Sequence, residues 1–129
     1  MRYVRRIGDY DFFRRFPDEA ACRDDLLRRR FGARPVCPGC GRAARFARLA
    51  GRAAHACPWC RRQLYPAAGT PYARSHVPLI LWYYAVFWSV YDRRVPSAPA
   101  LQRRLGIGYA AAWRLARVLR RHFAAAWPD

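Results

Sequence analysis

The stretch "CPGCGRAARFARLAGRAAHACPWC", residues 37–60, decides how this chain folds. It begins and ends with a Cys-x-x-Cys pair, and the full spacing is Cys-x2-Cys-x16-Cys-x2-Cys. A Cys-x-x-Cys turn is tight enough to present two sulfurs to one ion, and structural zinc takes four ligands in tetrahedral geometry. The spacing therefore predicts one structural zinc ion (Zn2+) held by Cys37, Cys40, Cys57 and Cys60.

The residues around the cysteines favour a small ribbon. Pro38 and Pro58 preset the backbone after the first cysteine of each pair, and Gly41 can adopt a positive φ after the second. The segment "RFARLAGRAAHAC", residues 45–57, predicts two short antiparallel strands joined at Ala50-Gly51. Because thiolates would fill all four metal positions, no position is open to water, and we expect the metal to be structural rather than catalytic.

A redox centre and a disulfide framework are the alternatives for these cysteines. A thioredoxin-like motif needs one Cys-x-x-Cys pair near a βαβ pattern, whereas this chain has two pairs and no such pattern. The N-terminus "MRYVRRIGDYDFFRRF" has no apolar region typical of a secretion signal. A cytoplasmic location is therefore expected, and a reducing compartment disfavours structural disulfides.

The flanking segments predict a small α+β fold. Residues 1–16 show no clear period and are interpreted as an extended arm. The next segment, "FPDEAACRDDLLRRRFG", predicts a helix that starts at Pro17-Asp18 and stops at Gly32. The expected domains are an N-terminal arm and helix (1–33), a zinc ribbon (34–70) and a helical helix-turn-helix region (71–129).

Residues 77–91, "VPLILWYYAVFWSVY", are apolar on every side. A membrane-spanning helix needs about 20 such residues. This run is shorter and ends at Asp92, so a buried core helix is predicted and no membrane partner is expected.

The last segment, "PALQRRLGIGYAAAWRLARVLRRHF", predicts a helix, a tight turn at Gly106 and a second helix. The predicted packing stripe of the second helix comprises Tyr109, Ala112, Trp113, Ala116, Leu119 and Phe123. Arg114, Arg117 and Arg121 fall on a separate face. A helix-turn-helix places its second helix in the major groove of DNA, and the alternative is a plain helical hairpin with a solvated arginine face.

The formal net charge is +17, and all 25 basic residues are arginine. Residues 1–26 carry six arginines and six acidic residues, so the whole excess lies in residues 27–129. Nucleotide bias in the genome can explain why every basic residue is arginine. It does not explain the scarcity of acidic residues in residues 27–129. An excess of this size favours a polyanionic partner, and nucleic acid fits best.

The ordered set of motifs resembles the amino-terminal zinc-ribbon and helix-turn-helix region of bacterial insertion-sequence (DDE-type) transposases. The similarity extends from about Phe16 to Arg121. The segments that carry it are "FPDEAACRDDLLRRRFG", "CPGCG", "CPWCRRQ", "AAGTP", "VPLILW" and "LQRRLGIGYAAAWRLARVLRR".

The resemblance implies that this region binds the terminal inverted repeats of a mobile element. In the family, a separate carboxyl-terminal domain with an RNase H-like fold and acidic metal-binding residues cuts and joins DNA. Asp92 and Asp129 are the only acids after residue 26, so no catalytic domain and no enzyme activity are expected. The segment "GIGYAAAWR" also departs from the family, which usually has a serine before the tyrosine and polar residues after it.

The resulting hypothesis is a nucleoid-associated, zinc-dependent protein of bacterial cytoplasm that binds double-stranded DNA, with an intact transposase as a further partner and no small-molecule substrate. The alternative is a zinc-ribbon adaptor for an acidic protein or RNA, in which the ribbon arginines matter more. The predicted DNA contacts are Arg103, Arg104, Tyr109, Arg114, Arg117, Arg120 and Arg121. Because alanines follow Tyr109, phosphate contacts should dominate over base readout.

Overall fold

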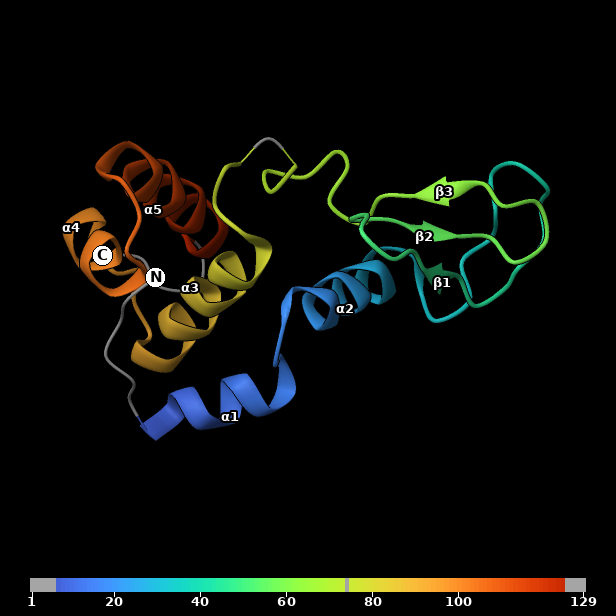
Figure 1. Ribbon diagram of the computed structural model, residues 1–129. Helices are drawn as coiled ribbons and strands as arrows, with labels where there is room; N and C mark the ends of the chain where they lie inside the picture. The colour runs from blue at the N-terminus through green and yellow to red at the C-terminus, as the bar shows by residue number, and fades with distance from the viewer. Residues whose placement is uncertain (1–6, 74, 125–129) are drawn as a thin grey trace. The chain divides into compact units, whose positions relative to one another are not determined.

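Strands and helices occupy two units of the computed structural model, which describes residues 7–73 and 75–124. The ribbon unit comprises residues 20–73, and the helical unit comprises residues 1–19 with 74–129. The described residues form five helices and one three-stranded antiparallel sheet, which confirms the predicted small α+β fold (Figure 1). The helices are α1 (Ile7–Arg15), α2 (Glu19–Phe31), α3 (Leu79–Asp92), α4 (Ala98–Leu105) and α5 (Tyr109–Phe123).

The sheet of the ribbon unit has the order β1-β2-β3, and its strands are β1 (Ala47–Arg48), β2 (His55–Ala56) and β3 (Gln63–Leu64). The predicted hairpin of two short strands is confirmed, with Ala47 paired to Ala56 across it. Strand β3 was not predicted, and it pairs with β2 through Gln63 and Ala56. A small core of this unit contains Leu27, Phe46, Cys37 and Cys57, with Leu64 packed against it.

Helix α2 follows its sequence signals closely. It begins one residue after Asp18 and ends before Gly32, whose φ of +83° is the left-handed conformation that glycine tolerates. The Gly32 amide donates to the Arg28 carbonyl at 2.8 Å and closes the last turn. Arg30 then donates to the carbonyl oxygens of Pro66 and Ala68, at 2.6 Å each. The end of α2 is thus tied to the segment that follows β3.

Helix α1 corrects one expectation. Residues 7–15 were expected to belong to an extended arm, and they are helical; residues 1–6 lie outside the described part of the chain. Phe12 is buried, and its ring lies 5.4 Å from the ring centroids of both Tyr84 and Phe87 on α3. A nine-residue helix is marginal by itself, so the packing of Phe12 on α3 stabilises it. The local sequence gives no sign of that packing.

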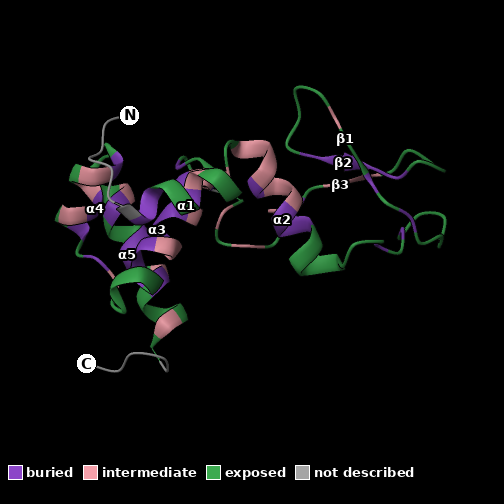
Figure 2. Cartoon of the chain, turned by 90° about the horizontal axis from the view of Figure 1, so that it is seen from below, coloured by how far each residue is buried: buried purple, intermediate pink, exposed green. Residues whose placement is uncertain are grey.

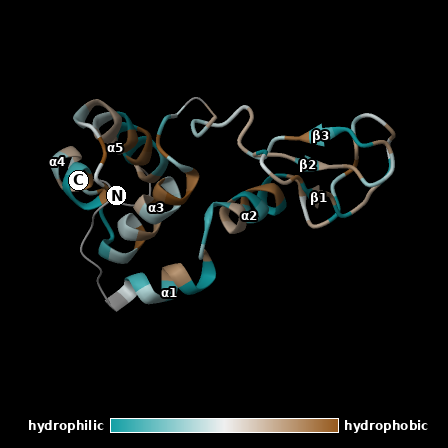
Figure 3. Cartoon of the chain, in the orientation of Figure 1, coloured by the Kyte–Doolittle hydropathy of each residue, from teal (hydrophilic) through white to brown (hydrophobic). Residues whose placement is uncertain are grey.

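Helix α3 is the centre of the helical unit and confirms the predicted core helix. Half of its residues are buried (Figure 2), and Figure 3 shows it mainly in the white-to-brown range of hydropathy. Pro78 at its N-cap provides no side-chain cap. The Glu19 carboxylate compensates by accepting hydrogen bonds from the amides of Leu79, at 3.1 Å, and of Ile80. Among the described residues, no helix combines the length and apolarity needed to cross a bilayer.

Helices α4 and α5 pack against each other, joined by the turn at Gly106. Ser97 caps α4 by accepting from the Ala100 amide at 3.2 Å. Gly106 has a φ of +67°, and its amide donates to the Gln102 carbonyl. The two helices and the turn therefore lie where the pattern predicts them.

The predicted packing stripe of α5 is wrong in part. The buried residues are Ala112, Leu115, Ala116 and Leu119, whereas Tyr109 and Trp113 are 57% and 46% exposed and Phe123 is half-buried. Leu115 lies three residues after Ala112 and four before Leu119, so helical geometry places all three on one face. The two aromatic residues lie at the edge of that face and remain available to solvent.

A buried polar network joins α1, α3 and α4. The Asp9 carboxylate and the Tyr84 ring are fully buried, and the Tyr84 hydroxyl donates to Asp9 at 2.7 Å. Arg104 lies 3.4 Å from the same hydroxyl and 3.9 Å from Asp9, and its guanidinium stacks over Trp88. Burial, together with the hydrogen bond to Asp9, raises the pKa of Tyr84 to about 12. The hydroxyl therefore stays protonated and donates to the carboxylate.

The network predicts that Arg104→Met destabilises the helical unit. A buried carboxylate would lose a nearby cation, at a cost of about 1–3 kcal/mol. Arg103→Met is the matched control, because Arg103 is exposed and its loss should change the free energy of unfolding by less than about 0.5 kcal/mol. Chemical denaturation of both variants measures the difference. Equal stabilities would contradict a role for Arg104 in the network.

Candidate metal centre and nucleic-acid interface

The two cysteine turns of the ribbon unit share one backbone pattern. In the first, which we call knuckle 1 (residues 37–42), the Cys37 amide donates to the carbonyl of residue 42 at 2.9 Å, and the Gly41 amide donates back to Cys37 at 2.8 Å. In knuckle 2 (residues 57–62), the amide of Cys57 donates to residue 62 at 2.8 Å, and that of Arg61 donates back at 3.0 Å. Each turn therefore places its two sulfurs in the same way.

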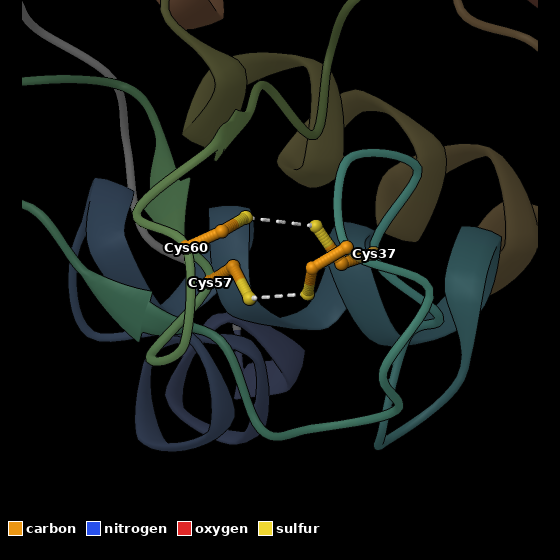
Figure 4. Close-up of side chains that lie close together, drawn as sticks. Cys37, Cys57 and Cys60 are labelled. Atoms are coloured by element: carbon orange, nitrogen blue, oxygen red, sulfur yellow. Dashed lines mark hydrogen bonds between the residues drawn. The ribbon is translucent and has the colours of Figure 1, made fainter.

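The four cysteine sulfurs converge on one point, as predicted. All of them lie within 4.8 Å of one another. The Cys37 and Cys60 sulfurs are 3.4 Å apart, and those of Cys40 and Cys57 are 3.8 Å apart (Figure 4). Zinc–sulfur bonds of about 2.3 Å in a tetrahedron require sulfur–sulfur distances of about 3.8 Å, whereas a disulfide needs about 2.0 Å. The arrangement fits a metal ion and excludes disulfides in this geometry.

The chemistry of the donors also fits zinc. Backbone amides, that of Cys40 first and then that of Gly39, stabilise the Cys37 thiolate and lower its pKa to about 6 despite burial. A thiolate is the form that binds metal. Four soft sulfur ligands in a tetrahedron are typical of zinc and leave no position for substrate or water. The cluster can bind a metal ion, and that ion would stabilise the fold of the ribbon unit.

His55 belongs to a different cluster from the metal ligands. It is 3% exposed, and its Nε2 lies 2.8 Å from the Asp24 carboxylate. Arg48 Nε donates to the same carboxylate at 2.7 Å. Although burial raises the pKa of Asp24, the bonds from Arg48 and His55 outweigh it and lower that pKa. This cluster ties α2 to strands β1 and β2, and no local motif could reveal it because its members lie far apart in sequence.

The predicted DNA contacts fall into two groups. Arg103 and the α5 basic face, which we define as Arg114, Arg117, Arg120 and Arg121, are exposed. Tyr109 is exposed at the start of α5, and the Arg117 guanidinium lies 5.4 Å from the ring centroid of Trp113. Arg104 differs, because it is 18% exposed and engaged with Asp9. Arg103, Tyr109 and the α5 basic face stay predicted as DNA contacts. The contacts of Arg104 with Asp9 and Tyr84 favour a structural role for that residue.

Comparison with known proteins identifies one part of the chain. Residues 17–63 match the model of the transposase zinc-ribbon domain of the IS1595 family. This match covers α2, strands β1 and β2, the first residue of β3 and the four clustered cysteines, and it supports the ribbon part of the resemblance. It does not extend to helices α3–α5. Searches of curated proteins and of solved structures gave no significant match.

Proposed function

We propose that this chain is a zinc-dependent DNA-binding protein that recognises the ends of a transposable element and does not itself cut DNA. One observation carries the proposal: α5, packed on α4 across the turn at Gly106, exposes the α5 basic face in a chain whose residues 17–63 match a transposase zinc ribbon. The closed four-sulfur site supports a structural role for zinc.

The arrangement of α4 and α5 supports a specific mode of binding. The second helix of such a pair lies in the major groove with its first residues near base edges. Here those residues are Tyr109, Ala110 and Ala111, and an alanine can only contact a thymine methyl group. Gly108 precedes them without a side-chain cap. Tyr109 would therefore face the groove, while the α5 basic face binds phosphates and supplies most of the affinity.

The test is the salt dependence of binding to a duplex oligonucleotide. Five arginines, Arg103 and the α5 basic face, would neutralise five phosphates and give a slope of log K against log salt of about −4.5. Affinity should then fall roughly 500-fold between 50 and 200 mM salt. Fluorescence anisotropy with a labelled duplex measures it, with polyglutamate of similar length as competitor. A flat salt dependence, or preference for polyglutamate, would favour the adaptor function instead.

A further inference from the structure

The two knuckles differ in side chains that their shared backbone does not require. Knuckle 1 reads "CPGCGR" and knuckle 2 reads "CPWCRR". Their amide-to-carbonyl hydrogen bonds are equivalent. Gly39 and Gly41 of knuckle 1 correspond to Trp59 and Arg61 of knuckle 2. Since knuckle 1 folds with glycine at both positions, neither the indole nor the guanidinium is needed to form the turn.

Arg61 occupies a backbone conformation that suits glycine. Its φ is +69°, close to the +76° of Gly41 at the equivalent position. L residues avoid this left-handed region because Cβ approaches the following carbonyl oxygen. A strained position is a reason to look for a function of the side chain. The Arg61 side chain is exposed, so it is available for binding.

Trp59, two residues before Arg61, presents an exposed aromatic ring. It is 60% exposed, an unusual state for so large an apolar side chain. The Arg42 guanidinium, from knuckle 1, lies 4.8 Å from the centroid of its ring. A guanidinium on one face of an indole restrains the ring by a cation–π contact and leaves the other face for a second planar group. We call Trp59, Arg42 and Arg61 the knuckle platform.

The charge around the knuckle platform indicates what that second planar group is. The ribbon unit contains eleven arginines, and its two acids, Asp24 and Asp25, are already bonded to Arg48, His55 and Arg29. Four thiolates and one zinc ion would lower the net charge by only two. A surface that joins an exposed aromatic ring to arginines suits a nucleic acid, whose bases stack while its phosphates bind the cations.

We propose that the knuckle platform binds an unpaired base of a DNA strand, with Trp59 stacked on the base and Arg42 and Arg61 near its phosphates. Bases inside a duplex already stack on their neighbours, so an exposed indole gains a partner only where a base is unpaired. This inference rests on the proposed DNA-binding function and adds a second site with a different preference. The α5 basic face would bind duplex, and the knuckle platform would bind single-stranded DNA.

The test uses the zinc-loaded full chain with two probes, a single-stranded DNA 15-mer and a blunt duplex of the same sequence. Trp59→Gly should weaken binding to the single strand by about 5- to 150-fold, the range for loss of one stacked base. Binding to the duplex should change less than about twofold. Gly39 shows that the turn accepts glycine, so the variant should keep the zinc content and the melting temperature of the native chain. Both quantities serve as controls in the experiment.

Two further variants make the test specific. Arg61→Gly should also weaken single-strand binding, and its melting temperature should not fall because glycine relieves the positive φ. Arg52→Gly removes the same charge from the turn between β1 and β2, at the opposite end of β2 from knuckle 2, and should have a much smaller effect.

Some outcomes would overturn the knuckle platform. These are unchanged single-strand binding by Trp59→Gly, no binding of the single strand by the native chain, equal losses on both probes, or tighter binding to the matching RNA 15-mer. One outcome separates the two proposals. If the native chain does not bind the duplex but binds the single strand, and Trp59→Gly weakens that binding, the α5 proposal fails and the knuckle platform stands.

Discussion

Cys57→Ser is expected to unfold the ribbon unit. Cys57 is fully buried, and its sulfur is one of four that converge on the metal position. Structural zinc sites contribute about 10–16 kcal/mol to folding, which equals or exceeds the net stability of about 5–15 kcal/mol typical of a whole protein. The apolar core around the metal position is too small to compensate, since its cluster combines Cys37 and Cys57 with Leu27, Phe46 and the partly buried Leu64.

The measurement is zinc content together with the thermal melt of the full chain. Cys22→Ala is the matched control, because Cys22 is also a fully buried cysteine of the ribbon unit but lies outside the four-sulfur cluster. It should retain one zinc ion per chain, whereas Cys57→Ser should lose it along with the cooperative transition of the ribbon. A Cys57→Ser protein with stoichiometric zinc and a native melt would refute the metal site.

The second large effect is expected on duplex binding, when three arginines of the α5 basic face are replaced. Arg114, Arg117 and Arg121 are exposed, so changing all three to glutamine should leave stability nearly unchanged. Each phosphate contact releases about 0.9 counterion. Loss of three contacts should then weaken duplex binding on the order of 100-fold at 150 mM salt.

A control for this variant must remove the same charge elsewhere in the helical unit. Arg14, Arg15 and Arg94 are also exposed, and their triple change to glutamine lowers the net charge equally. It should alter duplex affinity only a few-fold. Equal losses from the two triple variants would mean that net charge, rather than the α5 basic face, holds the DNA.

The parts of the fold that the sequence predicts are those with local causes. The knuckles, the hairpin and the end of α2 depend on cysteine spacing, a turn and a left-handed glycine, all visible within a few residues. The core helix and the α4–α5 pair show a clear apolar pattern. The predicted packing stripe of α5 nevertheless included Trp113, which is exposed, and omitted Leu115, which is buried.

The parts that the sequence does not reveal depend on distant partners. Helix α1 needs Phe12 to pack on Tyr84, seventy-two residues away, so its own pattern looks irregular. Arg104 looks like any other arginine of α4 until Asp9 is found buried beside it. Likewise, the positive φ of Arg61 cannot be read from "CPWCRR" without the three-dimensional match to knuckle 1.

The central claim is that the α5 basic face binds DNA phosphates, and the salt slope tests it most directly. Duplex binding by the native chain and by the Arg114, Arg117 and Arg121 triple-glutamine variant is titrated between 50 and 200 mM salt. The account predicts that the slope of log K against log salt becomes shallower by about 2.7 in the variant, from three lost phosphate contacts. An identical slope in the two proteins would contradict it.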